Sequence, residues 1–453
     1  MQQNRLRFWL VFSACLLAAI SAQAGGFSLY EQGARATALG GAFTATADDA
    51  TAVFYNAAGL GYLSGANLSV NGTLLFPSNK FAGAQPPTPG ATGETTSDVF
   101  FIPGMYFSYT LPSGWGFGVG LYAPFGLGVK WENPTTWIGR TTNYDVHLGT
   151  IYVTPAAAYK INEQWSVALG ADIAWQSIDL KRYDAIPFGG NSTLLNTVDV
   201  NLEGTSDLNV TPTVGVLFRP NDKWSFGVMY HHQKTFKYSD GDGRLTNVVP
   251  ADDPSLAAVR ANVDAQITSL GGPEHKIATE INIPYILSLG AKYRISARTT
   301  LEFNAVHWSW SDFDRIDLVF DGNPDSELNE TIRESYEDRW QIRLGLEAEL
   351  GKQWRGMLGF IHDKTPQPVE SMGPLLPDAT RNDFSLGAQY DYKQWSFIGH
   401  YMLVLNNERS TLQNGQVTYF NDASDDEIAT RRLEAGTYKA MAHIVGIGVN
   451  YNF

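Results

Sequence analysis

Few residues in this chain have the type and spacing that catalysis or metal binding requires. The eight histidines are scattered, and His231 and His232 are adjacent, so a strand would point them to opposite faces. The sequence contains no Gly-x-Ser-x-Gly elbow, no His-Glu-x-x-His pair and no phosphate-binding glycine loop. We therefore expect no enzyme active site, no metal site and no cofactor.

A small set of isolated charges within small and apolar segments remains. Arg182, Arg315 and Asp363 are such residues. A buried cation can hold a carboxylate headgroup through charge-assisted hydrogen bonds. Alternatively, these charges pair with one another and brace the interior of the protein. The residue pattern alone leaves both interpretations open.

Long runs of alternating apolar and polar residues predict β-strands over most of the chain. From Trp340 to Leu350 every even position is apolar, whereas four of the five odd positions are polar. Side chains alternate along a strand, so one face would meet lipid and the other a lumen. Aromatic residues make up 13% of the chain and charged residues only 17%, which agrees with this interpretation.

A repeated turn signature sets the expected number of strands. Five short polar turns each precede a tryptophan that opens an alternating run, namely Trp115, Trp165, Trp224, Trp354 and Trp395. A sixth turn, at Ile295–Thr300, lacks the tryptophan. Six hairpins with one further strand at each end give fourteen strands, and bacterial barrels need an even number. The predicted fold is all-β, a fourteen-stranded antiparallel transmembrane β-barrel over residues 63–453.

The segment before the first strand has neither a strand nor a helix pattern. Gly25–Leu60 is rich in Gly, Ala and Thr, and it cannot bury much apolar surface by itself. We expect residues 25–62 to form a hatch, that is, a plug inside the barrel.

The third predicted strand carries a proline near its middle. Proline cannot donate to a strand ladder, and within sheets it is confined to edges and bulges. We therefore expect a kink at Ala123, Pro124, Phe125 and Gly126 that opens a lateral gap in the wall. The alternative is a bulge that leaves the wall closed.

The ends of the chain indicate export. Residues 1–24 combine Arg5 and Arg7 with the apolar run Phe8–Ile20 and a small-x-small site at Ala22–Ala24, which predicts a cleaved signal peptide. The strand that ends at Phe453 resembles the assembly signal of outer-membrane barrels. We expect a location in the bacterial outer membrane.

Longer polar segments between the hairpins are expected as outer loops, among them Pro77–Ser97, Gly241–Pro273 and Asn406–Ala435. Only Gly241–Pro273 is expected to contain a helix. Asp253 could cap that helix with Pro254 in its first turn, and one apolar stripe follows, formed by Leu256, Val259, Val263, Ile267 and Leu270.

Five short motifs point to a family. They are Gly26-Phe27-Ser28-Leu29, Ala47-Asp48-Asp49-Ala50, Asn56-Ala57-Ala58, Ser309-Trp310-Ser311 and Leu376-Pro377-Asp378-x-x-Arg381. With these motifs the chain resembles the FadL-type outer-membrane transporters of long-chain fatty acids and other hydrophobic compounds, over essentially its whole length after residue 24. Ala57 stands where the family has proline.

The resemblance implies a fourteen-stranded barrel, a hatch and a lateral opening at a kinked third strand. It implies hatch or gating roles for Asp48, Asp49, Asn56, Ala57 and Ala58. It implies substrate contacts for Phe27, Leu29, Arg182 and Asp363. The family's pocket lysine is replaced by Asp317 with Arg315 on the same face, which leaves room for neutral or aromatic substrates.

The expected function is passive uptake of hydrophobic compounds, with long-chain fatty acids as the first candidate. The alternatives are aromatic hydrocarbons taken by the same route, and a non-specific diffusion porin. Expected partners are the hydrophobic ligand, outer-membrane lipid and lipopolysaccharide, and the barrel assembly machinery; the chain is expected to be a monomer. A net charge of −14 argues against nucleic acid as a partner.

Overall fold

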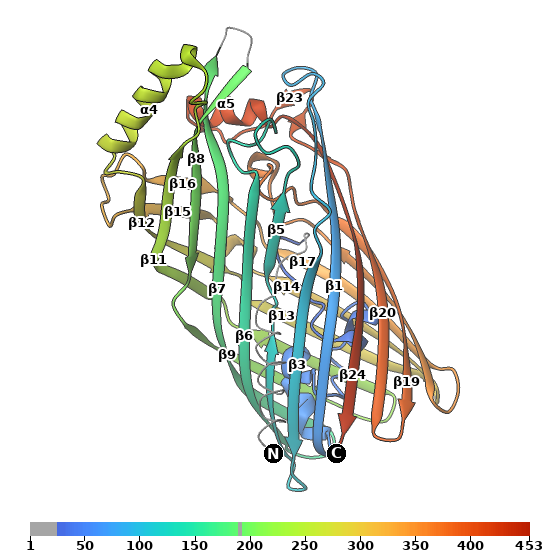
Figure 1. Ribbon diagram of the computed structural model, residues 1–453. Coiled ribbons are helices and arrows are strands. Elements are labelled where there is room, and N and C mark those ends of the chain that lie inside the picture. Colours follow the sequence, from blue (N-terminus) through green and yellow to red (C-terminus); the bar gives the residue numbers. More distant parts are fainter. Residues whose placement is uncertain (1–24, 189–192) are drawn as a thin grey trace.

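The computed structural model describes residues 25–188 and 193–453, so the predicted signal peptide lies outside the described residues. The chain forms one closed antiparallel barrel of fourteen wall strands (Figure 1). Closure is made by the first strand, β1, which pairs on one side with β3 and on the other with the last strand, β24. The predicted fold class and strand number are therefore confirmed.

Six wall strands are built from two segments each, and eight are continuous. The continuous strands are β1 (Gly65–Gly83), β3 (Phe100–Thr110), β6 (Asp145–Lys160), β7 (Trp165–Phe188), β18 (Trp354–Asp363), β19 (Arg381–Tyr392), β20 (Trp395–Asn406) and β24 (Gly436–Asn452). The two-segment strands are β4 (Trp115–Tyr122) with β5 (Gly126–Lys130), β8 (Thr193–Thr205) with β9 (Asn209–Phe218), β10 (Trp224–His231) with β11 (Lys234–Asn247), β12 (Glu274–Ile283) with β13 (Ile286–Ser296), β14 (Thr299–Trp308) with β15 (Arg315–Phe320), and β16 (Glu330–Arg333) with β17 (Arg339–Glu349).

The alternation of side chains follows the predicted faces. In β17, Trp340 and Leu344 are exposed on the outside, whereas Gln341 and Arg343 are buried inside. The five turn tryptophans open β4, β7, β10, β18 and β20, and all five side chains are exposed. These strand starts lie at one rim of the barrel, which agrees with an aromatic girdle at a membrane surface.

The hatch lies inside the barrel, near the end that holds the C-terminus (Figure 1). It contains two short helices, α2 (Ala34–Ala38) and α3 (Ala52–Tyr55), and the 3₁₀ turn η1 (Ala57–Tyr62). Nearly all of residues 25–60 are buried. Helix α2 packs against β19 and β20, whereas η1 packs against β4, β6 and β7 on the other side of the lumen. The surrounding strands therefore supply the packing that the hatch sequence lacks.

The outer loops differ from expectation in two ways. Strands β1 and β11 continue to Gly83 and Asn247, so the wall is taller than predicted. A second helix, α5 (Asp425–Leu433), follows Ser424, which forms a capping box with Glu427. The expected helix is present as η2 (Pro254–Leu256) and α4 (Ala257–Ser269), with Asp253 as its cap.

The remaining elements are short: β2 (Thr92–Glu94), β21 (Arg409–Ser410), β22 (Leu412–Gln413), β23 (Gln416–Val417), η3 (Trp310–Asp312) and η4 (Val369–Ser371). Among the described residues, no helix has the length and apolar character needed to cross a membrane.

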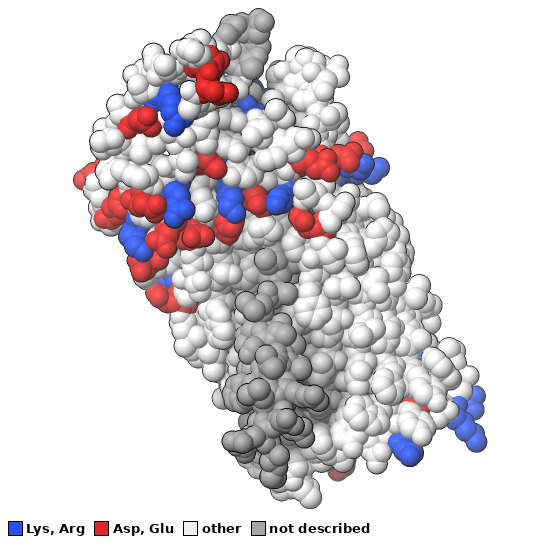
Figure 2. All heavy atoms as spheres, viewed as in Figure 1, with Lys and Arg blue, Asp and Glu red and all other residues white. Residues whose placement is uncertain are grey.

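The outer surface separates charged from uncharged zones. Figure 2 shows a belt of acidic and basic residues toward the end with α4 and α5, and a nearly uncharged zone below it. Exposed ion pairs on the upper parts of β7, β11 and β12 include Lys181–Asp179, Lys237–Glu280 and Lys276–Asp242. Below them the exposed side chains are large and apolar, for example Leu169, Val210 and Val214. This arrangement fits strands that face lipid.

Candidate functional site

The wall is interrupted at the predicted kink. Strand β4 ends at Tyr122 and β5 begins at Gly126. Strand β3 pairs with β4, whereas β5 pairs with β6 and, in the described part of the chain, not with β3. The hydrogen-bond ladder between the second and third wall strands therefore stops at Ala123–Phe125.

The hatch supplies hydrogen-bond partners to the interrupted backbone. The Leu29 amide donates to the Pro124 carbonyl at 2.8 Å, and the Gly126 amide donates to the Phe27 carbonyl at 2.9 Å. The Gln32 side chain bonds both backbone groups of Ala123, at 2.9 and 3.1 Å. Buried backbone groups that lose a strand partner must find another one. At the kink, the hatch therefore takes the place of a neighbouring strand as hydrogen-bond partner.

An apolar cavity of about 870 Å³, the inner cavity, lies beside this junction. Its walls are mostly aliphatic and come from strands on several sides of the barrel, for example Leu148, Ile178, Leu202, Ile281, Ile316 and Leu318. None of the described residues that line it is a lysine, an arginine or a histidine. A concave space with an apolar lining and a few polar groups is typical of sites for small hydrophobic ligands.

Phe27 separates the inner cavity from the kink. Its ring lines the cavity and lies edge-on to Phe125, with ring centroids 6.1 Å apart. It also contacts Trp310 and Phe313, at centroid distances of 5.1 and 5.2 Å. Phe27 thus touches the cavity and the interrupted strand at once.

A second space, the outer chamber of about 1190 Å³, lies above the inner cavity and shares Leu180, Leu202, Leu318, Ile332 and Leu375 with it. Helix α5 contributes to the chamber's wall. Arg182 lines this chamber rather than the inner cavity, and its guanidinium pairs with Glu330 at 2.7 Å. The two spaces together form an apolar path with a charged entrance.

Leu29 and Asp363 lie outside both spaces. Leu29 packs in a separate buried cluster with Tyr30 and Leu75, so it meets the kink through its backbone only. Asp363 is buried, pairs with Arg381 at 2.9 Å and accepts a hydrogen bond from Gln341 at 2.7 Å. Of the four contacts implied by resemblance, only Phe27 reaches the inner cavity.

The expectation that Arg315 faces the pocket is corrected by the structure. The even positions are buried in β14, as at Asn304 and Val306, and this parity continues beyond η3 into β15, where Ile316 and Leu318 point inward. Arg315 and Asp317 therefore point outward and pair with each other at 3.0 Å. The Arg315 side chain is 63% exposed and lines neither space.

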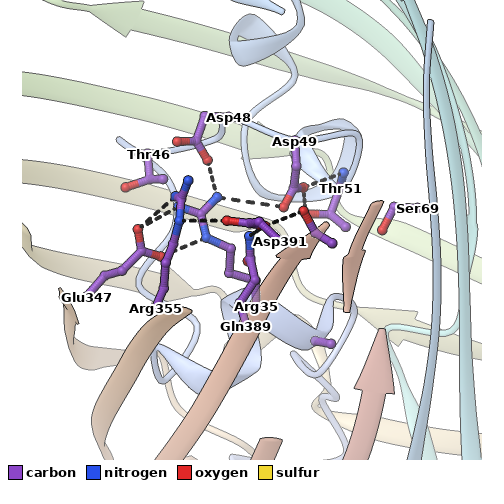
Figure 3. A network of polar contacts seen from close by, with 12 residues as sticks. Arg35, Thr46, Asp48, Asp49, Thr51, Ser69, Glu347, Arg355, Gln389 and Asp391 are labelled. Atoms are coloured by element: carbon purple, nitrogen blue, oxygen red, sulfur yellow. Dashed lines mark hydrogen bonds and ion pairs between the residues drawn. The ribbon is translucent and has the colours of Figure 1, made fainter. Parts of the chain in front are cut away.

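Asp48 and Asp49 take part in an ionic network that joins the hatch to the wall (Figure 3). Arg35 of α2 contacts Asp48 at 2.5 Å and Glu347 of β17 at 2.8 Å. Asp49 lies 4.0 Å from Arg35 and accepts hydrogen bonds from the amide and hydroxyl of Thr51. The network anchors one end of the hatch.

Asn56, Ala57 and Ala58 anchor the other end of the hatch. The Asn56 amide donates to the Thr44 carbonyl within the hatch and to the Val216 carbonyl of β9, at 2.9 and 3.0 Å. Its side-chain oxygen accepts from the Ala58 amide and caps η1. A Cβ on Gly215 would lie 2.6 Å from that oxygen, so the wall needs glycine there.

Several polar residues of the inner cavity were not predicted, and two of them are Glu334 and Tyr336. Both lie in the connection between β16 and β17 and are buried, at 4% and 3% exposure. The run Asn329–Trp340 is highly polar and has the composition of an exposed loop. No feature of the sequence indicates that this loop folds inward.

The family model and the related sequences identify the same protein family. The family described as "Outer membrane protein transport protein (OMPP1/FadL/TodX)" matches residues 15–453. A long-chain fatty acid transport protein of Escherichia coli O6:H1 is 24% identical over 405 residues, which cover 84% of this chain and 87% of that protein.

Solved structures share the fold. A FadL homologue of Pseudomonas aeruginosa matches with a TM-score of 0.77 at 18% identity, over 94% of this chain and 100% of that one. The toluene transporter TbuX of Ralstonia pickettii matches with a TM-score of 0.64 at 14% identity, over 94% and 100% of the two chains. At these identities the likeness concerns the fold alone.

Proposed function

Because the chain belongs to the OMPP1/FadL/TodX family of outer membrane transport proteins, we propose that it mediates passive uptake of hydrophobic compounds through the inner cavity and a lateral exit at the kink. A hydrophobic solute crosses the polar outer layer poorly but gains about 0.8 kcal/mol per CH₂ in hydrocarbon. A protein that receives it outside and releases it sideways removes the polar barrier.

The single observation that carries this proposal is the pairing of the hatch with the interrupted strand. Phe27 and Leu29 hydrogen-bond to the backbone on either side of Phe125, and the Phe27 ring also lines the inner cavity. A shift of the first hatch residues would break their hydrogen bonds to the kink. The same shift would remove the Phe27 ring from the wall of the cavity. Cavity and exit would then join.

One observation supports each of two classes of transported substrate. Arg182 in the outer chamber could attract a carboxylate, which supports a long-chain fatty acid at the entrance. The inner cavity has no cationic lining among the described residues, which supports a neutral hydrocarbon of the kind named for the toluene transporter. A diffusion porin is the weaker alternative, because the buried hatch fills the lumen where a porin has a water-filled channel.

The N-terminus of the exported chain fits the same proposal. Cleavage after Ala24 would make Gly25 the first residue. A Cβ built on Gly25 would lie 2.2 Å from an Asp363 carboxylate oxygen, so the new ammonium group would arise beside a buried acid. Pairing of that ammonium with Asp363 would hold the first hatch residues in place.

The test is uptake of oleate and of toluene by cells that produce the protein, compared with Pro124→Val and with deletion of residues 25–27. Valine restores a donor to the strand and favours continued pairing of the third strand with β3. We expect at least a tenfold fall in uptake of the transported compound in both variants.

Pro155→Val is the matched control, because Pro155 is an exposed proline in the uninterrupted strand β6. Barrel assembly is checked by heat-modifiable mobility in gels. Normal uptake by both correctly assembled variants would contradict the lateral route.

A further inference from the structure

The inner cavity contains polar atoms that lack a well-aligned hydrogen bond. They include Glu334 Oε2 and the Tyr336 hydroxyl, which are buried and lie next to each other, and Thr279 Oγ1. Glu334 and Tyr336 both line the cavity. Such groups are rare in folded proteins because each one lost its hydrogen bonds to water on folding.

The backbone holds these two side chains firmly. The Glu334 amide donates to the Asp314 carbonyl at 2.7 Å, and its carbonyl accepts from the Ser371 hydroxyl at 2.7 Å. The Tyr336 ring packs edge-on against Phe313 with centroids 5.0 Å apart, and also contacts Trp310. The polar atoms are therefore fixed at the cavity wall, next to the aromatic cluster that contains Phe27.

The arginines nearest to Glu334 are engaged elsewhere. Arg431 donates to the backbone carbonyls of Thr418, Met372 and Val369. Arg409 donates to the carbonyls of Asp378 and Gln367. Burial raises the pKa of Glu334 from 4.5 to about 8, so the carboxyl is mostly protonated at neutral pH.

A protonated carboxyl and a phenol each offer one O–H donor and also accept hydrogen bonds. This pair matches an uncharged oxygen in a ligand that is otherwise apolar. A carboxylate ligand would enter a cavity that offers it no cation and would lose its hydration. A plain hydrocarbon would offer neither polar group a further hydrogen-bond partner.

We propose that Glu334 and Tyr336 form a headgroup site in the inner cavity for uncharged ligands that carry a hydroxyl or carbonyl oxygen on a hydrophobic body. This inference rests on the proposed uptake function and specifies the ligand class that its cavity prefers. The bound oxygen lies at the Glu334 end, and the hydrophobic body extends along the aliphatic wall.

The test is calorimetric binding of four ligands of one shape to the protein in lipid nanodiscs: toluene, 4-methylphenol, 4-methylbenzoate and 4-methylbenzylammonium. We expect 4-methylphenol to bind about tenfold more tightly than toluene, and the two ions to bind no more tightly than toluene. Tyr336→Phe and Glu334→Leu should each remove most of the phenol's advantage while toluene affinity stays within about twofold. Glu334→Gln, which keeps a donor and an acceptor, should retain most of it.

Glu163→Gln serves as the matched control, because Glu163 is exposed in the turn between β6 and β7 and lines neither space. Equal affinity for toluene and 4-methylphenol, or tightest binding of either ion, would overturn the headgroup site and leave the uptake function standing. A phenol preference that survives both Tyr336→Phe and Glu334→Leu would also overturn it. Absence of binding by all four ligands, together with normal uptake in Pro124→Val, would count against the uptake function itself.

Discussion

The backbone amide of Leu29 donates to the carbonyl of Pro124 at 2.8 Å, which joins the hatch to the point where the third wall strand is interrupted. Pro124 breaks the ladder because it has no amide hydrogen, and its carbonyl would otherwise face an apolar interior. The interrupted strand therefore depends on the hatch for hydrogen bonds, and the hatch depends on the wall for its packing. Four predictions follow from this dependence and from the cavities beside it.

Gln32→Leu should destabilise the junction between hatch and wall. The Gln32 side chain serves the amide and the carbonyl of Ala123, and leucine would leave both buried and unpaired. Each such group costs about 1–3 kcal/mol, so we expect the free energy of unfolding in guanidinium to fall by roughly 2–4 kcal/mol. Gln413→Leu, at an exposed position, is the control. Equal stability of the two variants would mean that the kink does not depend on the hatch.

Leu202→Trp should block transport. Leu202 lines both the inner cavity and the outer chamber, so an indole there occupies the passage between them. We expect uptake to fall at least tenfold while the barrel assembles normally, as measured with radiolabelled oleate or toluene. Leu74→Trp, on the lipid-facing side of β1, provides the comparison and should transport normally. Unimpaired uptake by Leu202→Trp would place the route elsewhere.

Arg35→Met should loosen the hatch. The substitution leaves Glu347 and Asp48 without their shared cation, and the loss of one partner from a buried ion pair costs roughly 3 kcal/mol. Because the Asp48 side chain is 40% exposed, the effect should fall at the lower end of such values. We expect the variant to conduct more ions in planar bilayers than the parent protein, whose lumen is filled by the hatch. Lys80→Met breaks the exposed pair with Glu94 and should leave conductance unchanged.

Glu334 should make stability depend on pH. Its folded pKa is about 8 and its ordinary value is 4.5, so the folded state holds a proton that the unfolded state has released. Stability should therefore fall as pH rises from about 4.5 to about 8, because the unfolded state binds fewer protons in that range. Glu334→Gln should flatten this part of the unfolding profile, measured in guanidinium between pH 5 and 8. A profile unchanged by Glu334→Gln would show that another group titrates there.

The regular part of the barrel could be predicted because each signal is local. A tryptophan after a short polar turn marked the starts of β4, β7, β10, β18 and β20, and alternation assigned the faces. Pro124 indicated an interruption because proline removes a donor from the strand ladder, although Pro155 lies within the continuous strand β6. The helix α5 also has a local signal, the capping box formed by Ser424 and Glu427.

The cavity could not be predicted in the same way, because it depends on how distant segments meet. Arg315 was placed inward by its position beside the family's pocket lysine, but the inward positions of β15 are Ile316 and Leu318, so Arg315 points outward. Glu334 and Tyr336 lie in a run with the composition of a surface loop, and only the folding of that loop into the barrel buries them. Asp363 lies beside Gly25 of the hatch, and no spacing in the sequence encodes this neighbour.

The pairing of β1 with β24, the seam that closes the barrel, bears on the order in which the protein folds. Its seventeen paired positions run from Asn67 opposite Asn452 to Gly83 opposite Gly436, and they join the first wall strand to the last one translated. The hatch precedes β1 in the chain and ends up encircled. Because it precedes β1, the hatch can enter the lumen while the wall is still an open sheet, and pairing of β1 with β24 then encloses it.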